Sequence, residues 1–321
     1  MRVVLSLAIV LASLAPLRAH AQSLQGPVYA VDYDQLYSVD LGTRTATLIG
    51  AAGSNGPQTI ADLSGLTSAP DGTLYAASDT IKGLVRINAA TGDATVIGNF
   101  GITSAQTGMA SDAPLDFGMT FGCDGQLWLS SATADMLWTV NPATGTSTLV
   151  GALGHAISGL TMLDGELYGT GTGDDPGLYH IDTASGAASL VGSFGSTVPF
   201  AASTSPGVDA LGRLLAAINY VPPPPGVDTT SDWSDLASID PATGAATILG
   251  PITGPDSLRG IGIRGISFGP ADCTAAVNPP PGGEPTSGPT TVPAGGTLSR
   301  LLELLGLLAL AGLALVRGRG R

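Results

Sequence analysis

The stretch LWTVNPATGTSTLVG, residues 137–151, decides the fold because variants of it recur along the chain. The other copies are LYSVDLGTRTATLIG at 36–50, LVRINAATGDATVIG at 84–98, LYHIDTASGAASLVG at 178–192 and LASIDPATGAATILG at 236–250. Each copy holds two runs of alternating apolar and polar residues around a Thr-Gly or Ser-Gly pair (Gly-Thr in the first copy). This pattern is typical of a strand, a tight turn and a second strand. The repeat therefore predicts five β-hairpins.

One Asp or Asn occupies the same place in every copy, at Asp40, Asn88, Asn141, Asp182 and Asp240. A short Asx side chain at the start of a turn accepts hydrogen bonds from backbone amides two or three residues later. We interpret these five residues as turn caps and not as ligands.

A second hairpin precedes each later copy. Its sequences are GLTSAPDGTLYAAS at 65–78, GMTFGCDGQLWLSS at 118–131, GLTMLDGELYGTG at 159–171 and a degenerate STSPGVDALGRLLAA at 203–217. In the first three of these hairpins an Asp-Gly pair marks the turn. Together, the two hairpins predict a repeating unit of four strands.

The first unit has only its second strand, PVYAVD at 27–32, before its copy of the phrase. The missing strand is found at the other end, as IRGISFGP at 263–270, which shares the Gly-apolar-Thr/Ser pattern of residues 118–122. The prediction is an all-β fold: a five-bladed β-propeller of four-stranded antiparallel blades, closed by pairing of its N- and C-terminal strands. Crowding at the axis explains glycine on the innermost strands, at Gly65, Gly118, Gly159 and Gly265. A parallel β-solenoid is the alternative.

The charge of the chain limits the classes of partner that it can bind. The chain has 321 residues and a formal net charge of −13, from 12 Lys and Arg against 25 Asp and Glu. Only six of the basic residues, but 24 of the acidic ones, lie between Gln22 and Ser299. Such a body repels phosphate backbones and anionic lipid, so we expect no nucleic-acid partner. Solubility alone accounts for the charge, and binding of a cation or a neutral ligand is the alternative.

The N-terminus, residues 1–21, has the features of a secretory signal peptide. Arg2 precedes an apolar run over residues 3–14, and Ala-His-Ala at 19–21 has the small-x-small form of a cleavage site. Export leads to an oxidising compartment, in which Cys123 and Cys273, the two cysteines of the chain, are a disulfide candidate. Two unpaired thiols are the alternative, since sequence does not give the distance between them.

The C-terminus predicts two further segments after a propeller at 22–275. Residues 276–299 are rich in Pro, Gly, Ser and Thr and serve as a linker. Residues 300–321 contain the apolar run 301–316, expected to form a membrane or sorting helix. Arg317, Arg319 and Arg321 follow it and act as the membrane stop on the cytoplasmic side.

This order of linker, apolar helix and Arg cluster resembles the C-terminal sorting signals of the PEP-CTERM and IPTL-CTERM class. The candidate motif lies in VPAGGTLS, at Val292, Pro293, Thr297, Leu298 and Ser299. It lacks Pro-Glu-Pro, and Ala-Gly-Gly separates its two parts. The resemblance implies processing by a membrane sorting protease and delivery to the cell envelope or surface, with a permanent membrane anchor as the alternative. The repeats resemble those of uncharacterised exported propellers, NHL-like and quinoprotein-like, which implies the fold.

A ligand face is expected where the second and third strands of each blade are joined and where one blade leads to the next. Loops 99–115 and 219–235 are long, and long loops on a rigid scaffold often carry function. The candidates on this face are Asp32, Asp34, Asp79, His155, Asp174, Asp175, Trp233, Arg259 and Arg264. The acidic pairs at 32–34 and 174–175 offer oxygen ligands to Ca²⁺ but lack EF-hand spacing, so we expect no metal and no cofactor.

No catalytic motif stands out. The chain contains no G-x-S-x-G and no H-E-x-x-H, and only two histidines follow the signal peptide. We therefore expect a non-catalytic binding or display module for a protein or carbohydrate partner. The alternatives are a secreted hydrolase or lyase acting on polysaccharide, with acids converging at the channel mouth, and a structural component of an extracellular matrix without a small ligand.

Overall fold

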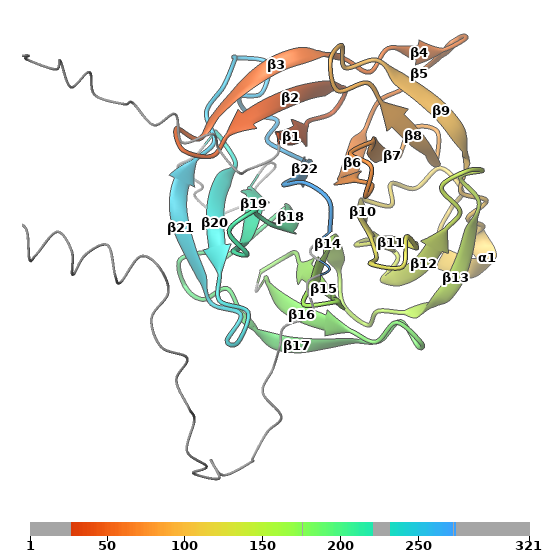
Figure 1. Cartoon of the computed structure of the whole chain (residues 1–321). Helices are drawn as coiled ribbons and strands as arrows, with labels where there is room; N and C mark the ends of the chain where they lie inside the picture. The colour runs from red at the N-terminus through yellow and green to blue at the C-terminus, as the bar shows by residue number, and fades with distance from the viewer. Residues whose placement is uncertain (1–26, 175, 221–231, 272, 274–321) are drawn as a thin grey trace, which may run out of the picture. The chain divides into compact units, whose positions relative to one another are not determined.

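The computed structural model describes residues 27–174, 176–220, 232–271 and 273, which form a ring of five four-stranded antiparallel sheets (Figure 1). All of them lie in a compact unit spanning Met1–Ala276; a second unit, Val277–Arg321, falls outside the described residues. The predicted signal peptide, the sorting motif, the apolar segment and its arginines also lie outside them. Among the described residues no helix is long and apolar enough to cross a membrane.

Each blade runs from an inner strand to an outer one. Blade 1 consists, from the inside outward, of β22 (Gly265–Ser267), β1 (Val28–Val31), β2 (Gln35–Asp40) and β3 (Thr45–Ala51). Blade 2 consists of β6 (Leu63–Ser68), β7 (Leu74–Ser78), β8 (Gly83–Ile87) and β9 (Ala94–Asn99), and blade 3 of β10 (Phe117–Phe121), β11 (Leu127–Ser131), β12 (Met136–Val140) and β13 (Ser147–Ala152). Blade 4 consists of β14 (Ile157–Leu163), β15 (Glu166–Gly171), β16 (Gly177–Ile181) and β17 (Ala188–Ser193), and blade 5 of β18 (Ser203–Val208), β19 (Leu214–Asn219), β20 (Asp235–Ile239) and β21 (Ala246–Pro251).

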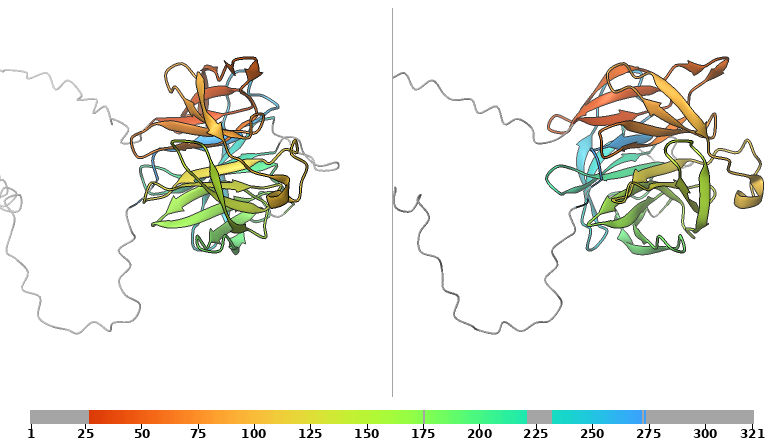
Figure 2. Two further views of the ribbon diagram at one scale, coloured as in Figure 1. Left: turned by 90° about the vertical axis from the view of Figure 1, so that its right-hand side faces the viewer. Right: turned by 45° about the vertical axis from the view of Figure 1, so that its right-hand side comes forward.

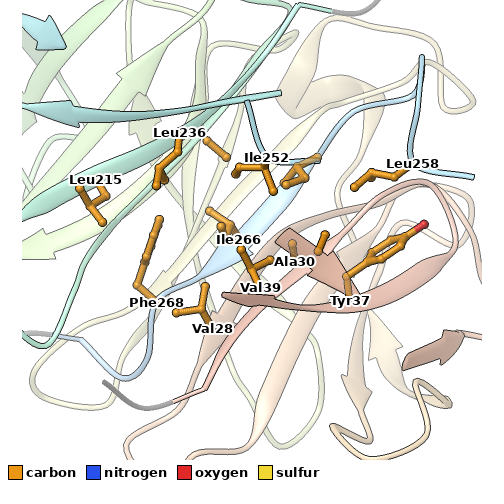
Figure 3. Close-up of a cluster of buried hydrophobic side chains, with 13 residues drawn as sticks. Val28, Ala30, Tyr37, Val39, Leu215, Leu236, Ile252, Leu258, Ile266 and Phe268 are labelled. Carbon is orange, nitrogen blue, oxygen red and sulfur yellow. The ribbon is translucent and has the colours of Figure 1, made fainter. Parts of the chain in front are cut away.

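The ring closes in blade 1, as predicted. β22, from the end of the ring, pairs antiparallel with β1, which places Tyr29 opposite Ser267, Ala30 opposite Ile266 and Val31 opposite Gly265. The apolar cluster at this junction combines Val28 and Ala30 of blade 1 with Leu215 of blade 5 and Phe268 (Figure 3). The split blade is therefore packed like the continuous ones.

A backbone hydrogen bond repeats at every junction between blades. An amide at the start of one outer strand donates to a carbonyl just beyond the preceding outer strand: Ala94 to Ala52 (2.9 Å), Ser147 to Phe100 (2.8 Å), Ala188 to Leu153 (3.0 Å), Ala246 to Phe194 (3.1 Å) and Ala46 to Thr253 (2.7 Å). The last of these joins blade 5 to blade 1. The closing junction thus has the same bond as the other four.

Glycine is required where four of the five inner strands meet a neighbour, as the sequence predicted. A Cβ on Gly118 would lie 2.6 Å from the Ser158 carbonyl oxygen of the next blade, which is too close for any side chain. In blade 5 the equivalent residue is Ser205, and its hydroxyl instead accepts a hydrogen bond from the Ile266 amide at 2.9 Å. Blade 5 therefore replaces close packing by a polar contact to the closing strand.

The turn caps behave as expected. Asp40 Oδ1 accepts the amides of Gly42 (2.8 Å) and Thr43 (2.9 Å), and Asn141 Oδ1 accepts the Ala143 amide at 2.9 Å. These backbone hydrogen bonds favour the ionised carboxylate and lower the pKa of Asp40. The five Asx residues are thereby explained by turn geometry.

Two small elements interrupt the blades where the sequence predicted only loops. The hairpin of β4 (Ser54–Asn55) and β5 (Gln58–Thr59) follows blade 1, and the single turn α1 (Ser104–Thr107) follows blade 2. We define the upper face as the end of the ring that carries these connections between blades and the loops between the second and third strands of each blade. The opposite end is the lower face. In the right-hand view of Figure 2, α1 (gold) projects on the side opposite to the blue end of the described chain.

The disulfide candidate is formed. Cys123, in the turn between β10 and β11 on the lower face, is bonded to Cys273, with the two Cα atoms 5.3 Å apart.

Candidate functional site

A pocket of about 390 Å³ lies on the upper face between blades 2 and 3. Three connections supply its walls: the one between β5 and β6, the loop between β7 and β8, and the long one between β9 and β10. The lining residues are Asp62, Asp79, Thr80, Lys82, Ser111, Asp112 and Pro114. This volume falls in the range of roughly 300–1,000 Å³ typical of small-molecule sites.

Asp79 lines the pocket and is only 4% exposed. Its Oδ2 accepts the Leu115 amide at 2.9 Å, and its Oδ1 pairs with the Lys82 ammonium. Lys82 Nζ also donates to the Ala113 carbonyl at 2.7 Å. Both ends of this ion pair therefore hold the β9–β10 connection against blade 2, and neither charge is left without a partner.

Arg264 links three blades beside the pocket. It directly precedes β22, and its amide donates to the Val31 carbonyl at 2.9 Å. Its guanidinium lies 3.0 Å from Asp62 Oδ1 and 2.7 Å from Asp116 Oδ1. Asp62 stands just before the inner strand of blade 2, and Asp116 just before that of blade 3.

The two aspartates occupy unusual backbone positions, with φ of 53° at Asp62 and 47° at Asp116. Aspartate tolerates this left-handed conformation better than most residues. Burial raises the pKa of Asp62 above its usual range, while the Arg264 charge opposes that shift. Burial of Asp62 thus favours its protonated form, while its ion pair with Arg264 favours the carboxylate.

The central channel offers no comparable space at the lower end. The pocket there measures about 20 Å³ and is lined by Thr67, Thr120, Thr161, Pro206 and Phe268 among others. The lower end of the channel is therefore nearly filled, whereas the pocket at the junction of blades 2 and 3 lies on the upper face, where the ligand face was expected.

The first acidic candidates serve the fold. Asp32 is 1% exposed, and its carboxylate accepts the amides of Asp34 (3.0 Å) and Gln35 (2.8 Å) and the Tyr37 hydroxyl (2.6 Å). Burial raises the pKa of Asp32. Asp34 is half-buried beside it. These groups form a turn, and Asp32 has no oxygen directed at solvent for a cation.

The remaining candidates are spread over other blades. His155 is exposed and lies against the Tyr179 ring, with centroids 4.6 Å apart. Partial burial raises the pKa of nearby Asp135, and a positive charge on His155 opposes that shift. Asp174 is exposed on blade 4, and Asp175 lies outside the described residues.

Two candidates lie at the opposite side of the ring. Arg259 donates to Asp232 Oδ2 at 2.9 Å in an exposed ion pair, and Trp233 packs on the apolar cluster between blades 5 and 1. Among the described residues no group of three or more His, Cys, Asp or Glu side chains has the arrangement of a metal site.

The structure therefore brings together Asp79 and Arg264 of the predicted set, and adds Asp62, Lys82 and Asp116, which the sequence reasoning missed. The missed aspartates share one signal, an Asp placed directly before the Leu or Phe that opens an inner strand. We call Asp62, Asp79, Lys82, Asp112, Asp116 and Arg264 the upper-face cluster.

Comparisons with known proteins yield likenesses in structure and none in sequence. No family model matches the chain, and no curated protein matches it. A protein of unknown function from Bacteroides thetaiotaomicron aligns at 16% identity and a TM-score of 0.45, over 60% of this chain and 54% of that one, so the chain spans about half its length. Virginiamycin B lyase from Staphylococcus aureus aligns at 15% and 0.39 over 71% of both chains, and TolB from Acinetobacter baumannii at 15% and 0.40 over 70% of this chain and 53% of that one. The last two are β-propellers of the NHL-like and quinoprotein-like kind.

Proposed function

We propose that this chain is an exported, envelope-anchored or surface-sorted β-propeller that binds a partner on its upper face without catalysing a reaction. The observation that carries the proposal is the pocket of about 390 Å³ whose buried charges are committed to the fold. A catalytic carboxylate needs room to exchange a proton with substrate. Asp79 instead holds a backbone amide and an ammonium, which favours a preformed recognition surface.

Carbohydrate is the partner class that we propose for this surface. Thr80, Ser111 and Asp112 are exposed at the pocket and present hydroxyl and carboxylate groups that hydrogen-bond to sugar hydroxyls. Tyr33 is 46% exposed, and its carbonyl accepts the amide of Leu63, the residue after Asp62. This bond holds the Tyr33 backbone next to the connection that carries Asp62, and exposed aromatic side chains are surfaces that amphipathic ligands use.

The binding test uses the full-length protein on an array of neutral, acidic and amino oligosaccharides, with and without a calcium chelator. Asp112→Asn is the test variant, and Asp124→Asn, the same change in a lower-face turn, is the matched control. We expect at least one sugar class to bind, Asp112→Asn to weaken it about tenfold, as loss of a charge-assisted hydrogen bond does, and Asp124→Asn to leave it unchanged. Equal binding by both variants, or none by the wild type, contradicts the carbohydrate proposal.

Export and sorting rest on the two termini. The signal-peptide pattern at 1–21 and the linker, apolar run and Arg cluster at 276–321 support secretion, followed by engagement of a membrane sorting protease. Mass spectrometry of the protein from its native envelope tests this. We expect peptides that begin at Gln22 and none beyond about residue 299; recovery of intact Arg317 points instead to a permanent membrane anchor.

A polysaccharide hydrolase or lyase is a second candidate, favoured by one observation. Asp62 combines a raised pKa with a place in the pocket wall, as a general acid would. If the protein depolymerises any oligosaccharide that it binds, Asp62→Asn must abolish turnover while binding persists. Binding without turnover leaves the binding module as the function.

A further inference from the structure

The segment after β22 crosses the lower end of the channel. Residues 266–271 line the small space there together with all four other inner strands. Ser267 Oγ lies 2.7 Å from Ser68 Oγ of blade 2, and Pro270 forms a parallel bridge with Ser68. The lower channel mouth is therefore covered by the last part of the ring.

Apolar contacts extend this cover to the far blades. Phe268 is buried against Gly207 of blade 5, where an added Cβ would collide with its ring. Ala271 packs on the apolar cluster of Trp128 and Leu160, from blades 3 and 4. The segment then ends at Cys273, whose disulfide partner Cys123 lies in blade 3.

The two bonded cysteines flank the shortest strand of the five blades. β22 has three residues and forms the last pairing of the propeller. The start of β1 and the end of β22 both lie at the lower face, because Tyr29 pairs with Ser267. A force on the chain beyond Ser267 would therefore separate β22 from β1 one residue pair at a time, starting at the lower face. Two paired strands resist a force in this direction least.

The chain continues for 48 residues beyond Cys273, to Arg321. Whatever holds that tail pulls first on Cys273. The covalent bond passes the load to the β10–β11 turn of blade 3, and β22 lies inside the loop that the two cysteines close, which are 150 positions apart in the sequence. The load therefore bypasses the pairing that closes the ring.

We propose that the Cys123–Cys273 bond is a tension clasp, which keeps β22 on β1 and the lower channel mouth covered while the C-terminal tail is pulled. The same bond holds Cys273 on the lower face, at the end of the ring opposite to the upper-face cluster. Both sulfurs belong to exposed residues, so a dithiol can reach the bond. Dithiothreitol would reduce it to two thiols and be oxidised to its cyclic disulfide.

Single-molecule pulling tests the clasp on the full-length chain. One handle is attached at the C-terminus and the other to a peptide tag inserted between Asp164 and Gly165, in the exposed turn of blade 4. In Cys123→Ser/Cys273→Ser we expect an early, low-force step before the main unfolding, as residues 263–273 peel off. Eleven residues extend by at most ~40 Å. The oxidised wild type should lack this step.

Reduction supplies the second arm, in case the double variant fails to fold. Dithiothreitol added to a folded wild-type molecule under low tension should produce the same early step, and reoxidation at zero force should remove it. An early step of that length in the oxidised molecule, or its absence after reduction, overturns the proposal. Neither outcome depends on a ligand, so the test is independent of the proposed binding function.

Discussion

A methyl group added at Gly98, in β9, should break the junction between blades 2 and 3. A Cβ there would lie closer than 3.0 Å to the Thr144 carbonyl oxygen, which belongs to a turn of blade 3. Because that atom is backbone, the outer strand and the turn must move apart. The amide and the hydroxyl of Ser147 both donate to the Phe100 carbonyl at 2.8 Å, directly beside the clash, and would be pulled off it.

The cost follows from these contacts. Overpacking of a tight site costs about 1–3 kcal/mol. Loss of the two hydrogen bonds adds about 0.5–1.5 kcal/mol each. We therefore expect Gly98→Ala to lower the free energy of unfolding by about 2–6 kcal/mol. Part of this is regained because alanine restricts the unfolded chain more than glycine does.

Urea unfolding followed by tryptophan fluorescence measures the change. The control is Gly42→Ala, whose nearest atom to the new methyl group is the movable Asp40 Oδ1 at 3.2 Å; we expect it to cost less than about 1 kcal/mol. A loss below about 1 kcal/mol for Gly98→Ala, or equal losses for the two variants, would refute the view that close backbone contact fixes the blade junctions.

Three further predictions concern the closure and the site. Phe268→Ala should lower the free energy of unfolding by about 3–5 kcal/mol in urea melts, because the ring is 4% exposed; a loss under 1 kcal/mol would mean that the segment does not pack on blade 5. Arg264→Gln should cost about 1–2 kcal/mol, since its partners are partly exposed and screened, and Asp116→Asn should cost little once Arg264 is gone; additive losses in the double-mutant cycle argue against the pairing. The raised pKa of Asp62 means that the native state binds this proton more tightly than the unfolded state does. The stabilisation from this proton is fully present below the pKa of Asp62 in the unfolded state and is lost as the pH rises through its pKa in the folded state. We therefore expect the free energy of unfolding of the wild type, relative to that of Asp62→Asn, to increase as the pH is lowered from 7 to 4. A difference between the two proteins that does not change with pH would contradict the raised pKa.

The ring could be predicted from sequence because its determinants are local and repeated. The alternation of apolar and polar residues predicts the strands, and the Asp-Gly pairs and Asx residues predict the turns. Residues 263–270, which supply the strand missing from the first unit, predict the split blade. The elements missed, β4, β5 and α1, occupy one copy each and are only two to four residues long. Such short elements are set by their surroundings and leave no periodic pattern.

The site was harder because its residues come from different blades. The ion pairs of Arg264 with Asp62 and Asp116 form only after blades 1, 2 and 3 have packed together. The left-handed backbone conformation of both aspartates cannot be predicted from the residue types alone. Asp32 shows the opposite error: its carboxylate looked available in the sequence, but the turn around it uses both oxygens. The pairing of the cysteines required a distance that sequence does not contain.

The split blade also sets an order of events during biogenesis. A chain that emerges with its N-terminus first can build blades 2 to 5 as each is completed, while β1 waits unpaired on its inner side until residues 265–267 arrive. Maturation then ends with a single joining event, followed by oxidation of Cys273 on Cys123. The ring cannot close before residues 265–267 have been delivered, so its last strand pair is also the one that joins its two ends.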